Sequence, residues 1–470
     1  MRGTVFSWLP LLLFLSESWA VKLAIQRRPQ SASSLPSPKA NNNSANDVVN
    51  INNQVYAVNI TLNGLPINVA LDWVYSDLWV KPPEAIPSFN DTKLKLKIRY
   101  ADANAFVSGD IGVGKFGLGQ DTVIPLQAFL SVNTDNVGPS FPGPQQANFD
   151  NGIFGLWGIG TFSSLVDQQV QTAYGTNATW GRGALANIFA LNETGSDYIG
   201  LSLSRVGDQA DTADGSFTVS EYDSDYQAVA NSPRLPYSQN GSWTVPLDGL
   251  SVNGKKIEWN SSIEQVPAGT LLVQLNFGAP NILMPAKQIA AIYSSIPGAA
   301  FSHNEYLTEF GTNDVWVVPC NASIDLVATF AGQNFPIHPL DLTDLKVVTS
   351  PDKTRNFTAC IGSITDSLGD LRTDALFGDS FLRNVYTVPL QIDFGTGGNT
   401  KGPRFVQMLS TTDNSTAQSD LITVRSALMA NMPPELSPVN LVRILNGTEN
   451  SSGRARGNSV SWVGGISLLV

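Results

Sequence analysis

Short runs of β-branched and aromatic residues, separated by Gly, Asn and Pro, follow one another from Val48 to about residue 410. Such runs with turn residues between them are typical of strands in an all-β protein. The dipeptides Asn63-Gly64 and Asn253-Gly254 predict tight hairpin turns. Helical stretches are few, and the best candidates are 163–174 and 285–296, where apolar residues recur at helical spacing. The sequence therefore predicts an all-β fold with a few short helices.

The composition restricts the classes of partner. The 470 residues are 42% hydrophobic and 14% charged, with a net charge of −11. This length suffices for two or three domains with a full core. The negative charge would repel a polyanion, so nucleic acid is not expected as a partner.

The N-terminus predicts secretion. Arg2 precedes an apolar run over 5–15, and Ser18 and Ala20 supply the small residues of a signal-peptide cleavage site. The run is too short to span a bilayer, and a buried N-terminal helix is the alternative. We therefore interpret residues 1–20 as a signal peptide. Residues 21–47 are rich in Ser, Pro and Asn, contain the dibasic pair Arg27-Arg28, and are interpreted as a linker or short pro-segment.

Twelve Asn-x-Ser/Thr sites fit a secreted chain, because such sites accept N-linked glycans. They are Asn42, Asn59, Asn90, Asn177, Asn192, Asn240, Asn260, Asn321, Asn356, Asn414, Asn446 and Asn450.

Cysteine and histidine are scarce. Cys320 and Cys360 could close one loop of about forty residues in an oxidising compartment, or could remain as two buried thiols. His303 and His338 lack the close spacing of a ligand pair. We expect no metal and no other cofactor.

The chain also contains an internal duplication. Leu71-Asp72 follows one Asn-Gly hairpin, and Leu275-Asn276 follows the other. The segment GIFGLWG at 152–158 has a counterpart in ALFGDSF at 375–381, each with two apolar residues before a glycine. Two β lobes are therefore predicted, over 48–225 and 226–409.

Over residues 50–409 the chain resembles the pepsin-like aspartic peptidases, and in particular their fungal members. In that family an Asp-Thr-Gly turn in each lobe carries one catalytic acid, and the first turn continues to Leu-Trp-Val, as at 78–80 here. The segment 97–112 is similar to the family's flap hairpin. In this comparison Tyr100 matches the flap tyrosine and Trp79 the tryptophan that hydrogen-bonds to it.

The resemblance implies a bilobal, monomeric fold with a central cleft for a peptide or protein ligand. It also implies a disulfide between Cys320 and Cys360. In the family two carboxylates share one proton and activate water together, whereas Asp72 pairs here with Asn276. A carboxamide neither takes nor gives a proton at useful pH, so such a pair cannot exchange acid and base roles.

The residues beside the two acids depart from the family as well. The triplets read Asp72-Trp73-Val74 and Asn276-Phe277-Gly278, so both threonines are missing. In the family these threonines tie the two turns together. We expect Trp73 and Phe277 to replace that tie with an apolar contact, and Val74 to distort its turn because the family has glycine there.

The favoured interpretation is a catalytically impaired aspartic-peptidase homologue that binds an extended peptide or another ligand without cutting it. The alternatives are an active acid endopeptidase and a structural surface glycoprotein. A GDSL-type esterase with Ser380 as nucleophile is rejected, because no histidine follows position 338 to activate the hydroxyl.

Residues 410–470 are rich in Ser, Thr and Asn and are expected to form a glycosylated, largely disordered tail. The apolar end of this tail is a weak match to a GPI signal, but a frayed secreted terminus is favoured, and cell-surface or cell-wall attachment remains open. The short segment 21–47 has few basic residues, so we do not expect it to remove itself at acid pH as the pro-segment of an active peptidase does.

Overall fold

A computed structural model provides the structure of the chain. It describes residues 21–26, 48–51, 55–73, 75–99, 105–119, 122–136, 152–160, 164–191, 197–205, 215–236, 243–264, 266–303, 314–367, 371–390 and 404–446.

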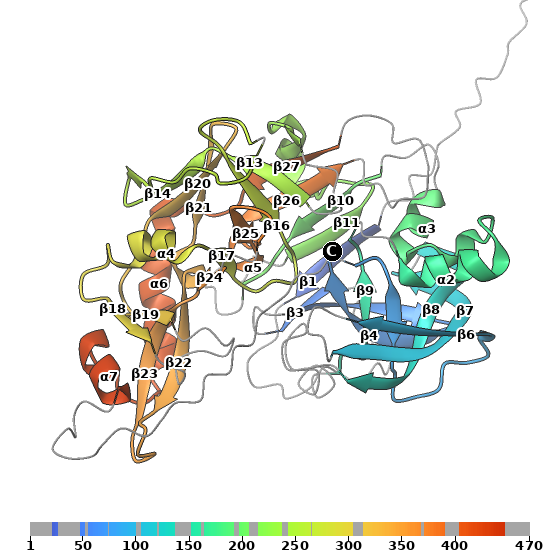
Figure 1. Cartoon of the computed structure of the whole chain (residues 1–470), viewed down its shortest axis with the longest axis horizontal. Helices are drawn as coiled ribbons and strands as arrows, with labels where there is room; N and C mark the ends of the chain where they lie inside the picture. Colours follow the sequence, from blue (N-terminus) through green and yellow to red (C-terminus); the bar gives the residue numbers. More distant parts are fainter. Residues whose placement is uncertain are drawn as a thin grey trace, which may run out of the picture.

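One sheet of fourteen strands runs through both halves of the molecule (Figure 1). Its order is β12-β27-β26-β10-β11-β1-β2-β3-β4-β9-β5-β8-β7-β6. The bounds are β1 Val21–Gln26, β2 Val48–Ile51, β3 Val55–Leu62, β4 Leu65–Asp72, β5 Leu78–Val80, β6 Asn90–Arg99, β7 Phe106–Leu118, β8 Thr122–Asn136, β9 Gly155–Gly158, β10 Ile199–Ser202, β11 Gly215–Val219, β12 Leu235–Pro236, β26 Val385–Leu390 and β27 Phe405–Ser410.

Three smaller sheets build the C-terminal half, in the orders β13-β16-β25-β17-β24, β15-β14-β20-β21 and β18-β19-β23-β22. Their strands are β13 Trp243–Leu247, β14 Gly249–Val252, β15 Lys255–Lys256, β16 Leu271–Leu275, β17 Ile282–Met284, β18 Ala300–His303, β19 Asp314–Val318, β20 Leu326–Phe330, β21 Gln333–Ile337, β22 Thr343–Thr349, β23 Asn356–Gly362, β24 Thr365–Asp366 and β25 Ala375–Phe377.

The helices within the described ranges are few and mostly short. They are α2 Leu165–Tyr174, α3 Ala184–Ala190, α4 Ala286–Tyr293, α5 Asp379–Leu382, α6 Asn414–Met429 and α7 Pro438–Leu445, with 3-10 turns η1 Thr179–Gly181, η2 Ser224–Asn231 and η4 Pro339–Asp341. Both helices expected from the sequence are therefore confirmed as α2 and α4. None of the described helices is both long and apolar enough to cross a membrane.

The hairpin turns form as expected. Asn63 and Gly64 have φ values of 49° and 86°, and Asn253 and Gly254 have 50° and 74°. These positive values are the ones that a two-residue hairpin turn requires.

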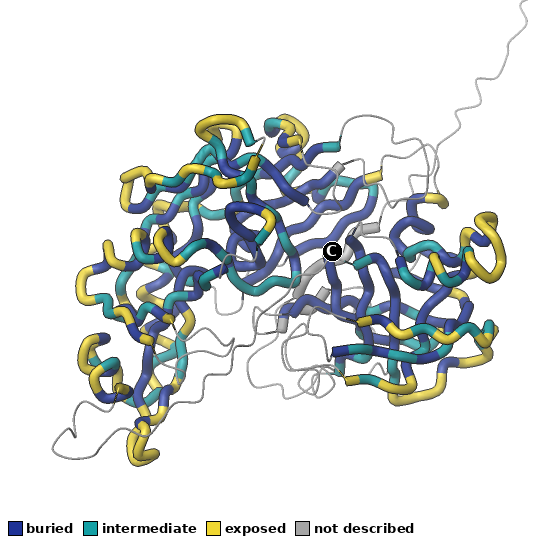
Figure 2. The backbone as a smooth tube through the Cα atoms, in the orientation of Figure 1, coloured by how far each residue is buried: buried dark blue, intermediate teal, exposed yellow. Residues whose placement is uncertain are grey.

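Buried backbone runs through both halves of the molecule (Figure 2). One hydrophobic cluster joins residues of β3 and β4 to residues of β13 and β16. The all-β, two-lobed architecture predicted from the sequence is confirmed. The Cys320–Cys360 disulfide is also present and joins the turn after β19 to β23 across 40 residues of sequence.

The start of segment 21–47, which was interpreted as a linker or short pro-segment, forms a strand. Residues 21–26 form β1, which pairs with β11 in antiparallel register from Val21↔Val219 to Ile25↔Gly215. β1 also pairs in parallel with β2. The backbone hydrogen bonds of these pairings place β1 inside the large sheet.

The predicted disordered tail is wrong over 414–446, because α6 and α7 are folded against the C-terminal half (Figure 1). Leu441, Ile444 and Leu445 of α7 are buried on the sheet that contains β19 and β23. In α6 the buried residues Ala417, Leu421 and Val424 recur at helical spacing. The free energy gained by burying these apolar side chains is enough to order the segment, although most of its residues are polar.

Candidate active site

Two equivalent turns lie at the centre of the molecule. β4 pairs in parallel with β9, in a register that sets Asp72 opposite Gly158. β16 pairs in parallel with β25 up to Leu275↔Phe377, and the Asn276 N–H then donates to the Phe377 carbonyl at 3.0 Å. Each turn then leads into a strand antiparallel to β9 or β25, namely β5 and β17. Asn276 is therefore the structural counterpart of Asp72.

A glycine lies beneath each turn. A Cβ at Gly158 would stand 2.4 Å from the Tyr75 carbonyl oxygen, and one at Gly378 would stand 2.1 Å from the Ala279 carbonyl oxygen. Any other residue would push the turn away from the sheet. The glycines of GLWG and LFG therefore let both turns pass directly over β9 and β25.

The residues after Asp72 and Asn276 bring the two turns together. The rings of Trp73 and Phe277 are both buried, with centroids 5.7 Å apart. Trp73 also meets Trp243 at 5.0 Å, and Phe277 meets Tyr56 at 5.4 Å. The structure thus joins the turns through an apolar aromatic cluster. Val74 lies outside the described residues.

Asp72 is 9% exposed, and its Oδ1 accepts a hydrogen bond from the Tyr75 N–H at 2.9 Å. The Tyr75 phenol lies close enough to the carboxylates of Asp72 and Asp77 for their charges to affect its pKa. Its pKa is raised by burial and, further, by the nearby carboxylates of Asp72 and Asp77. A phenol whose pKa is raised stays protonated and can donate a hydrogen bond. Sequence reasoning missed Tyr75, although the residue stands only three positions after Asp72.

Asp77 is a second residue that sequence reasoning missed. It is buried, and its carboxylate accepts hydrogen bonds from the Ser164 hydroxyl at 2.7 Å and the Val166 N–H at 2.9 Å. Burial raises the pKa of Asp77 even though these donors favour its charged form. Asp77 thereby fastens the first turn to the N-terminus of α2. The Ser164 N-cap before an apolar run was the available signal.

Asp379 lies behind the second turn. Its Oδ1 accepts a hydrogen bond from the Gly278 N–H at 3.1 Å, while its Oδ2 has no hydrogen-bond partner among the described residues. The side chain is fully buried, and this burial raises the pKa of Asp379 to about 7. The equivalent position of the first lobe, directly after Gly158, is the apolar Ile159. The next residue, Ser380, which the motif FGDSF offered as an esterase nucleophile, is also buried and lies in α5.

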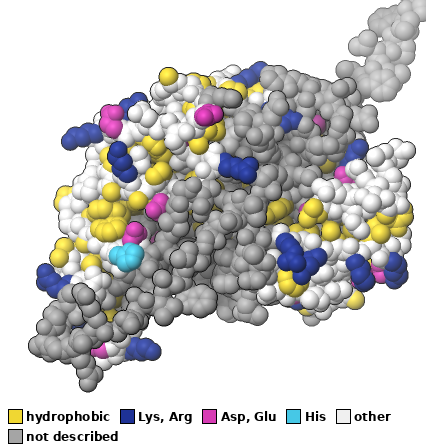
Figure 3. All heavy atoms as spheres, viewed as in Figure 1, with side chains coloured by type: hydrophobic (Ala, Val, Ile, Leu, Met, Phe, Trp, Pro, Cys, Tyr) yellow, Lys and Arg dark blue, Asp and Glu magenta, His cyan; other side chains and the backbone are white. Residues whose placement is uncertain are grey.

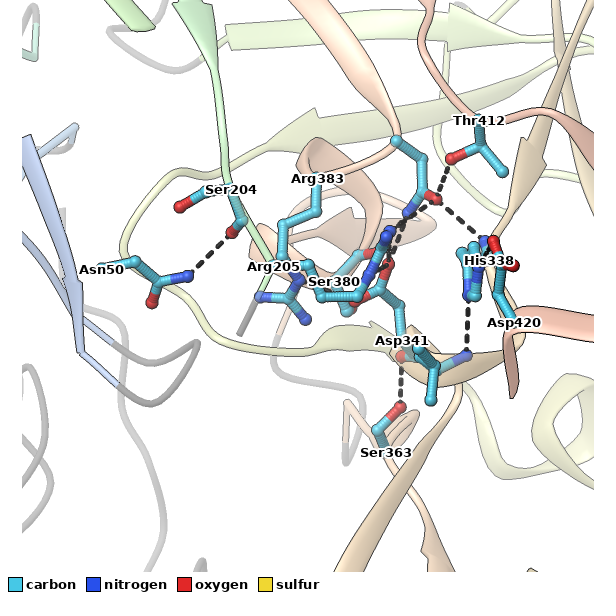
Figure 4. A network of polar contacts seen from close by, with 12 residues as sticks. Asn50, Ser204, Arg205, His338, Asp341, Ser363, Ser380, Arg383, Thr412 and Asp420 are labelled. Atoms are coloured by element: carbon cyan, nitrogen blue, oxygen red, sulfur yellow. Dashed lines mark hydrogen bonds and ion pairs between the residues drawn. The ribbon is translucent and has the colours of Figure 1, made fainter. Parts of the chain in front are cut away.

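A buried polar network joins the two halves further from the turns (Figure 4). Asp341 forms ion pairs with Arg205, which follows β10, and with Arg383, which follows α5. Burial opposes the charge of Asp341, but the two guanidinium groups hold its pKa well below the usual range. The Asn384 side chain donates to Asp341 Oδ2 at 2.9 Å. This network fixes β10 against the C-terminal half.

The predicted flap can be described only in part. β6 and β7 form the expected hairpin, paired from Lys95↔Asp110 to Arg99↔Phe106. Tyr100 lies outside the described residues. Trp79 is buried on β5, and its indole N–H finds no acceptor among them. The predicted hydrogen bond between these two residues remains a prediction.

The remaining predicted residues lie away from the turns. His303 pairs with Asp314 on the exposed face of β18 and β19, and His338 caps η4. Within the described ranges, no three His, Cys, Asp or Glu side chains are grouped closely enough to hold a metal ion.

The described glycosylation candidates are mostly accessible. Asn59 is half-buried in β3, where its amide donates to Asn68. Four candidates lie outside the described residues: Asn42, Asn192, Asn240 and Asn450. The exposed ones are Asn90, Asn177, Asn260, Asn321, Asn356, Asn414 and Asn446.

Comparisons with known proteins agree with this architecture. A model of the eukaryotic aspartyl protease family matches residues 82–393, a segment that contains Asn276 and begins after Asp72. An aspartic protease of Phaffia rhodozyma is 32% identical over 153 residues, which are 33% of each chain. The aspartic-type endopeptidase ctsD of Aspergillus fumigatus is 26% identical over 193 residues, which are 41% of this chain and 35% of that protein.

These two alignments span about a third of the length of either relative. The family model, by contrast, covers more than half of the 470 residues, and its matched segment begins just after β5 and extends through β26. This chain belongs to the eukaryotic aspartyl protease family.

Proposed function

We propose that this protein is a catalytically impaired member of its family that binds an extended peptide at the paired turns without hydrolysing it. The observation that carries the proposal is the position of Asn276. The strand register makes it the counterpart of Asp72, so the pair of turns offers one carboxylate and one carboxamide.

Hydrolysis of a peptide bond by two acids needs one group that takes a proton from water and another that gives a proton to the carbonyl. Asp72 can serve as a base. Asn276 can orient a water or a ligand carbonyl through its amide, but it cannot deliver a proton. Asp379 does not supply the missing acid, because it is fully buried behind the turn and bonded to the Gly278 N–H.

The aromatic contact between Trp73 and Phe277 supports the same proposal. A hydrogen-bonded tie fixes direction as well as distance, whereas an apolar ring contact holds two segments together with less directional control. The turns are thus joined firmly in a way that does not depend on aligning two acids. Such a site suits binding better than proton transfer.

We further propose that the protein is secreted and N-glycosylated. The apolar N-terminal run, the Cys320–Cys360 disulfide and the exposed sequons support this environment.

The decisive experiment is acid proteolysis. The purified protein is incubated with a denatured protein substrate at about pH 3 to 5, the range in which an acid dyad works, with and without a statine-type inhibitor. The proposal expects no inhibitor-sensitive cleavage. Cleavage that the inhibitor blocks and that Asp72→Asn abolishes would instead identify an active endopeptidase.

Binding is tested separately with an immobilised peptide library. Wild type should retain a subset of peptides, and Asp72→Asn should retain fewer, because the carboxylate accepts hydrogen bonds from the ligand. Asp314→Asn removes an exposed carboxylate on β19 and serves as the matched control. Retention of no peptide by wild type would favour the structural surface glycoprotein.

A further inference from the structure

The last strand of the large sheet, β6, carries an unusual row of cations. Among the described residues β6 has a strand neighbour only on its β7 side, and no described strand pairs with its other edge. Alternate side chains of a strand point to opposite faces. Leu94, Leu96 and Ile98 pack into a hydrophobic cluster that includes residues of α2, whereas Lys95, Lys97 and Arg99 are exposed on the opposite face.

These three cations are only partly neutralised. Lys95, whose side chain is 80% exposed, forms an ion pair with Asp110 at 2.8 Å. The Lys97 ammonium lies 3.4 Å above the centroid of the Phe106 ring. Arg99 has no acidic partner in the part of the chain that the structure describes. Counting the described residues alone, the row therefore carries two cations that form no ion pair, in a chain whose net charge is −11.

The face beside this row is polar. Lys97 is opposite Ser108 on β7, and Ser108 is opposite Thr134 on β8, next to the exposed Asn133. Lys and Arg side chains gather at the lower right of Figure 3, over the region that β6 and β7 occupy in Figure 1. A partner for this face must therefore be polar and anionic.

The spacing of the cations indicates the form of the partner. Alternate residues of a strand lie about 6.8 Å apart, and an extended peptide with acidic residues at every second position repeats at the same distance. Lysines at a sheet edge discourage pairing with neutral or basic strands, but oppositely charged side chains across two strands stabilise the pair.

We propose that the edge of β6 away from β7 is a docking site for an extended acidic peptide segment, whose carboxylates pair with Lys95, Lys97 and Arg99 while its backbone bonds to the strand edge. The proposal does not depend on whether the paired turns bind or cut a peptide. The Phe106 ring holds Lys97 in place from the same face.

The test uses a fluorescein-labelled peptide of alternating Glu and Thr, and its anisotropy is measured with the full-length protein at low and at moderate salt. We expect binding that weakens on adding salt, because exposed charge pairs are screened. The triple variant Lys95→Gln, Lys97→Gln, Arg99→Gln should bind at least about tenfold more weakly, since each of three surface pairs contributes up to about 1 kcal/mol.

The matched control is Lys255→Gln, Lys256→Gln, which removes two exposed lysines from β15 in the other half of the molecule. This variant should bind the peptide as wild type does. The charge-conserving variant Lys95→Arg, Lys97→Arg, Arg99→Lys should also keep the affinity. Thermal unfolding of each variant checks that its fold is intact.

Three results would overturn the proposal. The first is equal affinity for a matched Gln-Thr peptide. The second is an unchanged affinity of the folded triple Gln variant. The third is much tighter binding of polygalacturonate than of the Glu-Thr peptide, because the row would then recognise an anionic polysaccharide.

Discussion

The rings of Trp73 and Phe277 meet at 5.7 Å and join the turn that carries Asp72 to the turn that carries Asn276. Both rings are buried in the cluster that also includes Trp243 and Tyr56. Because Trp73 and Phe277 directly follow Asp72 and Asn276, the packing of this cluster also sets how Asp72 and Asn276 are positioned relative to each other.

Restoring the missing acid by Asn276→Asp should not restore peptidase activity. A second carboxylate would recreate a pair of like charges, but both acids must reach one water within about 2.6 to 3.2 Å. A misplacement of about 1 Å can reduce the rate about a hundredfold. The measurement is acid proteolysis by wild type, by this variant and by a quadruple variant that adds Trp73→Thr, Val74→Gly and Phe277→Thr. Robust, inhibitor-sensitive cleavage by the single variant would show that only the acid was missing.

Trp73→Ala should lower the free energy of unfolding by about 3 to 5 kcal/mol, because it empties a buried site between Trp243 and Phe277. Urea titration followed by fluorescence measures this loss. Phe301→Ala removes a ring that is 51% exposed and should cost roughly 1 kcal/mol or less. Equal losses in the two variants would contradict a special role for the cluster.

Stability should fall as the pH rises from about 4 to about 7. Burial raises the pKa of Asp379 from 3.8 to about 7, so the folded chain keeps a proton that the unfolded chain releases. At about 1.4 kcal/mol per pKa unit, the free energy of unfolding falls by at most about 4 kcal/mol over this pH range.

Asp379→Asn should flatten this dependence, whereas Glu84→Gln, at an exposed position, should leave it unchanged. Urea unfolding at several pH values between about 4 and 8, on either side of the raised pKa, measures the effect. If the Asp379→Asn protein showed the wild-type slope, another group would be responsible.

Removing the disulfide by Cys320→Ser and Cys360→Ser should lower the free energy of unfolding by about 4 kcal/mol. The bond closes a sequence separation of 40 residues, and the estimate comes from the lost restriction of the unfolded chain. Chemical denaturation of the oxidised wild type and of the double variant provides the comparison. A difference below about 1 kcal/mol would contradict the estimate.

Leu441→Ala should destabilise the protein by about 2 to 5 kcal/mol, because Leu441 is fully buried between α7 and its sheet. Val439 on the same helix is 50% exposed, so Val439→Ala is the matched control and should have little effect. Urea denaturation compares the two variants. A disordered tail would make both substitutions neutral.

The sequence by itself determined the strand-rich architecture, the two Asn-Gly hairpins and the helices α2 and α4. These features follow from local rules, since the periodicity of apolar residues and the φ preferences of Asn and Gly act within a few residues. The position of Asn276 also followed from sequence, because the two lobes repeat one order of motifs.

Tertiary structure alone decided the surroundings of these residues. Asp379 and Gly278 are about a hundred residues apart in sequence, and their hydrogen bond exists only because β25 lies beside β16. Asp77 likewise accepts hydrogen bonds from Ser164 and Val166 at the start of α2, almost ninety residues later in the sequence. These bonds form only because the first turn lies beside Gly158 of β9. The composition of residues 410–446 predicted disorder, but burial of α7 on a distant sheet offsets the entropy that ordering costs. A contact between distant segments cannot be read from local preference, because its free energy depends on what the rest of the chain brings to the same place.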